Sequence, residues 1–133
     1  MNKYLLDTNI ISFYLKGDER LKEIVSINID SSAIPIISYY EIVSGLQSIN
    51  ASKRINKFEE FCELIDIINL DKASILDSCG IYSALKKSGN LIDDIDILIA
   101  GIALANNLVM ITDNISHFER IAGLRVENWV KRT

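Results

Sequence analysis

Six of the 18 acidic residues lie at four separate places in the sequence, each beside a short apolar run. They are Asp7, then Glu41, then the cluster Asp93, Asp94 and Asp96, and finally Asp113, which is followed by Asn114. Carboxylates without nearby His or Cys favour a hard divalent cation such as Mg²⁺ or Mn²⁺. Such a centre suits phosphoryl chemistry, because the cation withdraws charge from phosphate oxygens and activates a water for in-line attack.

Each of these acids also has a purely structural explanation. Asp7 could cap a helix, and Glu41 could be an acid in the first turn of a helix, where the dipole favours it. The sequence "TDN" at 112–114 could be a turn. Unrelated capping acids should be distributed over both edges of a sheet, whereas these acids all follow strands or begin neighbouring helices. The pattern therefore favours one shared cation site.

The elements that must position these acids alternate between short apolar runs and longer amphipathic stretches, which predicts an α/β fold. The predicted strands are residues 3–6, 33–38, 65–70, 108–112 and 124–129. Strands joined through helices pair in parallel by right-handed crossovers. We therefore expect a three-layer α/β/α sandwich with a mostly parallel sheet of about five strands, and a site beyond the carboxyl ends of the strands.

Two details of this arrangement can be predicted more closely. Pro35 indicates that the early end of the second strand lies outside the ladder or at an edge. In the helix that starts at the aspartate cluster, Asp96 shares one face with two alanines at i+4 and i+7, whose small side chains allow a close approach to the sheet. We therefore expect Asp96 to point inward, Asp93 to be the N-cap and Asp94 to be an outer acid.

The chain of 133 residues is long enough for a single domain spanning residues 1–133. Its two cysteines follow no metal-ligand spacing, and no secretory leader is recognisable. Its apolar runs are shorter than the roughly 18 residues that a membrane span needs. We therefore expect a soluble, cytoplasmic protein with reduced thiols.

The net charge of −4 argues against a broad basic surface that grips nucleic acid through phosphate neutralisation alone, so any polyanion must be drawn in locally. The candidate basic groups are Lys53, Arg54 and Lys57, then Lys86 and Lys87, and then Arg125, Lys131 and Arg132. We expect each group to be an ordinary solvated helix face or tail.

The order and spacing of four segments resemble the PIN domain, and specifically the VapC-type toxins of type II toxin–antitoxin pairs. The segments are "LLDTNII", "SYYEIVSG", "DIDILIAGIALANNLVMITDN" and "HFERIAGLRVENW", which together extend over nearly the whole chain. The resemblance implies an endoribonuclease, a hydrolase of phosphodiester bonds, that depends on Mg²⁺ and for which Mn²⁺ is a substitute. It also implies an RNA substrate, a homodimer and a cognate antitoxin that restrains the activity.

Carried over by position, the resemblance makes Asp7, Glu41 and Asp96 the catalytic, metal-binding acids. The fourth position, acidic in many members, is Asn114 here, with Asp113 one residue earlier. Both are therefore candidate metal ligands, and the number of metal ions stays open.

Further polar residues match positions that orient the acids or the metal's waters. They are Thr8, Asn9, Ser38 and Thr112, with Asp94 as the outer acid. His117, the only histidine, stands where the resemblance has an often acidic residue, so we expect it on a helix surface and not as a general base.

Two other classes of protein remain open at this point. A PIN-like module that binds or regulates without catalysis is favoured by Asn114. A phosphoryl-transfer enzyme with an aspartyl-phosphate intermediate would also place an aspartate, here Asp7, after the first strand, but "DTN" lacks the second acid two residues on. Which RNA is cut, and whether DNA is also cut, is not encoded in these motifs.

Overall fold

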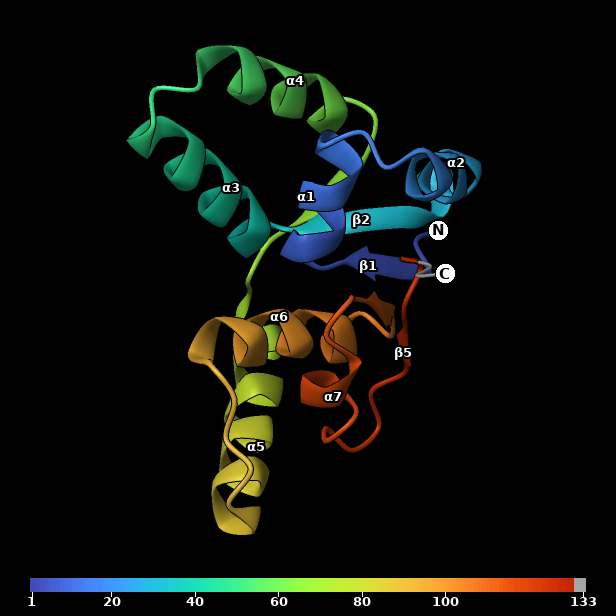
Figure 1. Cartoon of the computed structure of the whole chain (residues 1–133). Coiled ribbons are helices and arrows are strands. Elements are labelled where there is room, and N and C mark those ends of the chain that lie inside the picture. Colours follow the sequence, from blue (N-terminus) through green and yellow to red (C-terminus); the bar gives the residue numbers. More distant parts are fainter. Residues whose placement is uncertain (131–133) are drawn as a thin grey trace.

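The computed structural model describes residues 1–130, so the predicted basic residues Lys131 and Arg132 lie outside the described part. A central sheet separates two groups of helices (Figure 1). Helices α1–α4 cover one face of the sheet, and α5–α7 cover the other. The predicted three-layer α/β/α architecture is confirmed.

The elements have the following bounds and order in the chain. They are β1 (Tyr4–Leu6), α1 (Thr8–Leu15), α2 (Glu19–Ile27), the 3₁₀ turn η1 (Ile29–Ser31), β2 (Ser32–Pro35), α3 (Ile36–Ser48), α4 (Ser52–Cys62), β3 (Asp66–Ile68), α5 (Lys72–Ser88), α6 (Asp94–Ala105), β4 (Val109–Ile111), α7 (Ile115–Phe118) and β5 (Val126–Glu127).

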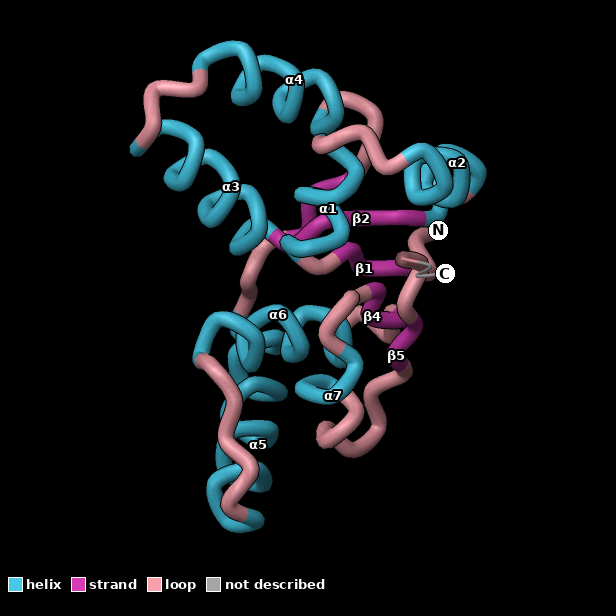
Figure 2. The backbone as a smooth tube through the Cα atoms, viewed as in Figure 1, coloured by secondary structure: helices cyan, strands magenta, loops and turns pink. Residues whose placement is uncertain are grey.

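The sheet has five strands in the order β3-β2-β1-β4-β5, and every neighbouring pair is parallel. Figure 2 shows the strands between the two helical layers. The chain moves outward from β1 in one direction through β2 and β3, and then crosses back to place β4 on the other side of β1. The strand order therefore reverses between β1 and β4, and ligands of open parallel sheets bind beyond the carboxyl ends at such a point.

Side chains of the central strands alternate between two hydrophobic cores, as a period of two requires. Leu5 and Met110 face the core beneath α5 and α6, whereas Leu6 and Ile111 face the core beneath α1 to α4. All four are at most 1% exposed. Burial on both faces explains why the strand sequences are continuous apolar runs.

The boundary between β2 and α3 differs from the prediction. The apolar run 33–38 was expected to be one strand, but β2 ends at Pro35 and α3 begins at Ile36. β2 is also an inner strand, and Pro35 lies at its later end, not its early end. Proline suits this position, because its φ of −75° is compatible with entry into a helix. At the last residue of the strand, the backbone N–H group that proline lacks is not needed for pairing.

Helices α5 and α6 pack closely below the sheet. Gly101 on α6 leaves room for this contact, since a Cβ atom there would lie 1.9 Å from Ser78 Oγ and 2.5 Å from the Ser74 carbonyl oxygen. Ser78 Oγ donates a hydrogen bond to the Ile97 carbonyl oxygen at 3.1 Å. In the part of the chain that is described, no helix is long and apolar enough to cross a membrane.

Candidate active site

Asp7 lies directly after β1, at the point where the strand order reverses. Its backbone N–H donates to the Ile111 carbonyl oxygen at 2.8 Å, which fixes the end of β1 beside the end of β4. The carboxylate caps α1 by accepting from the Thr8 N–H at 2.8 Å, and its other oxygen accepts from the Thr112 hydroxyl at 2.8 Å. The predicted capping role is therefore present, and it leaves the side chain only 4% exposed.

The electrostatics of Asp7 differ from those of an ordinary cap. Burial raises the pKa of its carboxyl from 3.8 to about 6, although the hydrogen bonds from Thr112 and Thr8 favour the ionised form. The negative charges of Asp96 and Glu41 raise this pKa further. A carboxylate that is buried near two others is unfavourable without a cation, so the local field favours binding of positive charge.

Glu41 reaches the same region from the second turn of α3, because the helix begins at Ile36. The Thr8 hydroxyl donates to Glu41 Oε1 at 2.6 Å, and the Ser38 hydroxyl lies 2.7 Å from the Thr8 hydroxyl. Since the single proton of Thr8 is given to Glu41, Ser38 acts as the donor to Thr8. This chain of hydroxyls holds the glutamate against the N-terminus of α1.

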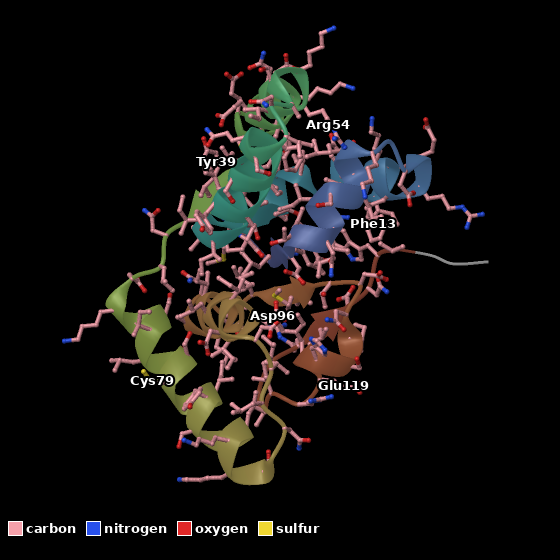
Figure 3. The ribbon with its side chains drawn as sticks, turned by 60° about the vertical axis from the view of Figure 1, so that its left-hand side comes forward. Phe13, Tyr39, Arg54, Cys79, Asp96 and Glu119 are labelled. Atoms are coloured by element: carbon pink, nitrogen blue, oxygen red, sulfur yellow. The ribbon has the colours of Figure 1, made fainter. Side chains whose placement is uncertain are left out.

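Asp96 enters from the first turn of α6, with its side chain 21% exposed. Burial raises the pKa of its carboxyl, a hydrogen bond and the charge of His117 lower it, and the charges of Asp93 and Glu41 raise it. His117 Nδ1 lies 3.5 Å from Asp96 Oδ2. In Figure 3 Asp96 lies in the middle of the molecule, where α6 faces α1 and α3.

The segment after β4 supplies the remaining polar groups. The Asn114 N–H donates to the Thr112 hydroxyl at 3.0 Å, and Asn114 Nδ2 lies 2.8 Å from His117 Nδ1. The Asp113 N–H donates to Asn9 Oδ1 at 3.2 Å, and Asn9 Nδ2 donates to the Thr112 hydroxyl at 3.4 Å. Asn9 thus ties α1 to this segment.

The predicted residues do not all gather at this place. Asp94 is exposed and lines a separate hollow between α5 and α6, together with Ile75 and Tyr82. Asp93 is the N-cap of α6 by position, but its side chain makes no capping hydrogen bond. Asp113 Oδ1 accepts from Asn128 Nδ2 at 3.0 Å.

His117 is the residue that the sequence reasoning missed. It was expected on a helix surface, and its side chain is indeed 39% exposed, but its ring contacts both Asp96 and Asn114. The one available signal was its spacing, because Asn114 and His117 are three residues apart and share a face if a helix begins between them. A four-residue helix, α7 (Ile115–Phe118), begins there.

The donor set fits a hard divalent cation, because it consists of carboxylate and amide oxygens from four segments. Each acid is also held by a neighbour: Asp7 by Thr112, Glu41 by Thr8 and Asp96 by His117. Within residues 1–130 no three His, Cys, Asp or Glu side chains already form a group that could hold a metal ion. Coordination would therefore draw these carboxylates closer together.

Comparison with known proteins agrees with this geometry. The PIN domain family matches residues 4–124. The chain is 30% identical over 131 residues to the tRNA(fMet)-specific endonuclease VapC of Salmonella typhimurium, covering 97% of this chain and 99% of that protein. It is 35% identical over 127 residues to Ribonuclease VapC1 of Methanocaldococcus jannaschii, covering 94% of this chain and 87% of that protein.

Solved structures show the same likeness in three dimensions. The crystal structure of DNA-bound VapBC from Salmonella typhimurium contains a chain that superposes with a TM-score of 0.92 at 30% identity, covering 98% of this chain and 100% of that chain. A VapBC-1 structure from nontypeable Haemophilus influenzae gives a TM-score of 0.85 at 31% identity, covering 96% and 98%. With the sequence match, the fold and the acidic edge in agreement, this chain belongs to the PIN domain family.

Proposed function

We propose that this protein is a Mg²⁺-dependent endoribonuclease of the VapC type, the toxin of a toxin–antitoxin pair. The observation that carries the proposal is the charge repulsion that Asp96 and Glu41 exert on Asp7, and Glu41 on Asp96, although the three acids come from separate segments; Asp7 itself follows β1, where the strand order reverses. Its relatives are ribonucleases and endonucleases by name, and they match the chain over nearly its full length.

Asp7, Glu41 and Asp96 would hold the metal, with Asn114 contributing its amide oxygen after a turn of the side chain away from His117. Asp113, whose Oδ1 accepts from Asn128, would be a further candidate ligand. Mn²⁺ would bind the same oxygens. Mg²⁺, when bound, would withdraw charge from a phosphate group and activate water for in-line attack.

The surrounding residues position the acids. The Thr8 N–H and the Thr112 hydroxyl each donate to one oxygen of Asp7 and fix its carboxylate. The Thr8 hydroxyl, itself held by Ser38, fixes Glu41. Such partners orient metal ligands, and their loss commonly costs 10- to 100-fold in metal affinity or activity.

The partners follow from the same assignment. The substrate is RNA, and a cognate antitoxin restrains the enzyme, as the VapBC complexes among its structural relatives suggest. The active form is a homodimer in the cytoplasm. A module that binds without cleaving stays the second candidate, because the fourth acidic position holds Asn114, whose amide faces His117.

The decisive test is cleavage of single-stranded RNA by the purified full chain with and without Mg²⁺. Asp7→Asn and Asp96→Asn should each lose activity at least 100-fold while remaining folded. Asp94→Asn is the matched control: it removes the same charge from the same helix turn, but its side chain lies on the α5 side of α6.

Retained cleavage in Asp96→Asn, or an equal loss in Asp94→Asn, would contradict the assigned site. A folded wild-type protein that binds RNA but cleaves none at any Mg²⁺ or Mn²⁺ concentration would support the binding module instead. Covalent phosphate on Asp7 would support the aspartyl-phosphate enzyme.

A further inference from the structure

A hollow of about 550 Å³ extends from the acidic site between α1, α3 and α4. Thr8 and Glu41 of the site form part of its wall, so the two regions are continuous. In Figure 3 Arg54 lies above α1 and Asp96 lies below it. The hollow has the size of a ligand-binding site, for which about 300 to 1,000 Å³ is usual.

The residues that line this hollow carry more positive than negative charge, whereas the whole chain is negative. Lys16, at the end of α1, and Arg54 and Lys57, on α4, all line it, although the chain carries a net charge of −4. Glu41, at the end shared with the acidic site, is its only acidic lining residue. The three cations therefore face the hollow, not a row of carboxylates.

These three cations have no partner within residues 1–130. All three are exposed, and their side chains make no ion pair, hydrogen bond or ring contact there. Some other cations within residues 1–130 are engaged: Arg125 donates to Asn107, and Arg120 donates to the Ser116 carbonyl oxygen. The charges of Lys16, Arg54 and Lys57 are therefore available to a ligand that enters the hollow.

The sequence had predicted a plain solvated face for this part of α4. Arg54 and Lys57 are three residues apart and so share one helix face, the face that borders the hollow. Lys53, which is equally exposed, does not line it. The floor between the cations is apolar, formed by Leu15, Ile42 and Leu46.

We propose that this hollow is a subsite for the RNA strand that flanks the scissile bond, with Lys16, Arg54 and Lys57 binding its phosphates and the apolar floor receiving its bases. The inference rests on the proposed nuclease function and assigns the direction in which the strand leaves the acids. Positively charged grooves that follow the backbone are a general means of holding single-stranded nucleic acid.

The three cations of the hollow also explain how an acidic protein can hold a polyanion. The carboxylates of the site repel phosphate, and the cations at the far end of the hollow offset that repulsion for the flanking nucleotides. Phosphate neutralisation makes affinity depend on salt, with a slope of about −0.7 per contact for a single strand. Each cation that contacts a phosphate should therefore be detectable as a change in that slope.

The experiment measures binding of a fluorescein-labelled single-stranded RNA oligonucleotide to the full chain in EDTA, where cleavage is blocked, by anisotropy between 50 and 300 mM NaCl. The variant is Arg54→Gln with Lys57→Gln. The matched control is Lys53→Gln, which removes one charge from the same helix outside the hollow. Melting temperatures establish that all proteins are folded.

The double variant should bind about 25-fold more weakly at 0.1 M salt, with a slope shallower by about 1.4, which corresponds to two lost phosphate contacts. Lys53→Gln should stay within about twofold of the unaltered protein, and in cleavage assays the double variant should raise KM more than it lowers kcat. These results would support the subsite.

A loss in Lys53→Gln as large as half of that in the double variant, on a logarithmic scale, would overturn the proposal, because it would show a diffuse charge effect. Unchanged RNA binding in the double variant, combined with lost binding of the cognate antitoxin, would overturn it in favour of a protein-docking groove. In either case Mg²⁺-dependent cleavage that still requires Asp7 would leave the proposed nuclease function standing.

Discussion

The substitution Asp7→Asn should stabilise the metal-free protein even though it removes a metal ligand. Burial raises the pKa of the Asp7 carboxyl from 3.8 to about 6. A difference of that size corresponds to about 3 kcal/mol of unfavourable free energy for the ionised form, at 1.36 kcal/mol per pH unit. The side chain is only 4% exposed, so solvent screening removes little of this.

The pH dependence follows from the sign of the change. Because the folded pKa is raised, the folded state binds more protons than the unfolded state between about pH 3.8 and 6. The contribution of Asp7 is therefore fully present below pH 3.8 and is lost as the pH rises through about 6. Asparagine is neutral at every pH, but its NH₂ group takes the place of a carboxylate oxygen. The hydrogen bond that the Thr112 hydroxyl donates to that oxygen is then lost, which costs about 1 kcal/mol.

The net expectation for Asp7→Asn is about 2 kcal/mol of added unfolding free energy at pH 8 in EDTA, and no gain at pH 3.5. Urea denaturation at a series of pH values measures it. Asp71→Asn is the control of opposite sign, since hydrogen bonds from the Ser74 backbone and hydroxyl lower the pKa of Asp71. An Asp7→Asn protein less stable than the unaltered chain at pH 8 would refute the account of Asp7 as a destabilising buried charge.

Four further substitutions test other parts of the structure. Gly101→Ala should lower the free energy of unfolding by about 1–3 kcal/mol, because a Cβ atom would lie 1.9 Å from Ser78 Oγ. Gly80→Ala on α5 should raise it by about 0.5–1 kcal/mol, because a Cβ atom there would meet nothing within 4 Å. Thermal denaturation compares the two variants. Thr8→Val removes the donor to the glutamate on α3 and should lower kcat about 10- to 100-fold with the fold intact by circular dichroism. His117→Ala removes the contact with Asp96 on α6 and should weaken Mn²⁺ binding about tenfold, as measured by calorimetry. An unchanged affinity would show that His117 is a surface residue that does not orient Asp96.

The order of strands and helices could be predicted because it depends on local chemistry, and the same reasoning explains why the charges of Asp7, Glu41 and Asp96 influence one another. Continuous apolar runs mark strands that are buried on both faces, and acids that follow such strands must share one edge in a parallel sheet. The boundary at Pro35 could not be predicted, because periodicity does not distinguish a short buried strand from the first turn of a buried helix. The predicted strand 33–38 therefore included the first three residues of α3, which begins at Ile36.

The features that were missed depend on how distant segments pack. Asp94 and Asp96 are two residues apart, and the helix turns them to different sides, so the sequence pattern could rank Asp96 first but could not place Asp94 beside α5. His117 reaches Asp96 only because α7 lies against α6, and the hollow beside Arg54 exists only because α3 and α4 fold back on α1.

The position of β4 beside β1 has a consequence for biosynthesis. Asp7 is made early, but the hydroxyl and carbonyl groups that fix it, from Thr112 and Ile111, are made after most of the polypeptide. A nascent or prematurely terminated product that stops before β4 lacks both anchors and has an unpaired edge on its first strand. The carboxylate of Asp7 therefore gains its full set of contacts only when nearly the whole polypeptide has been translated.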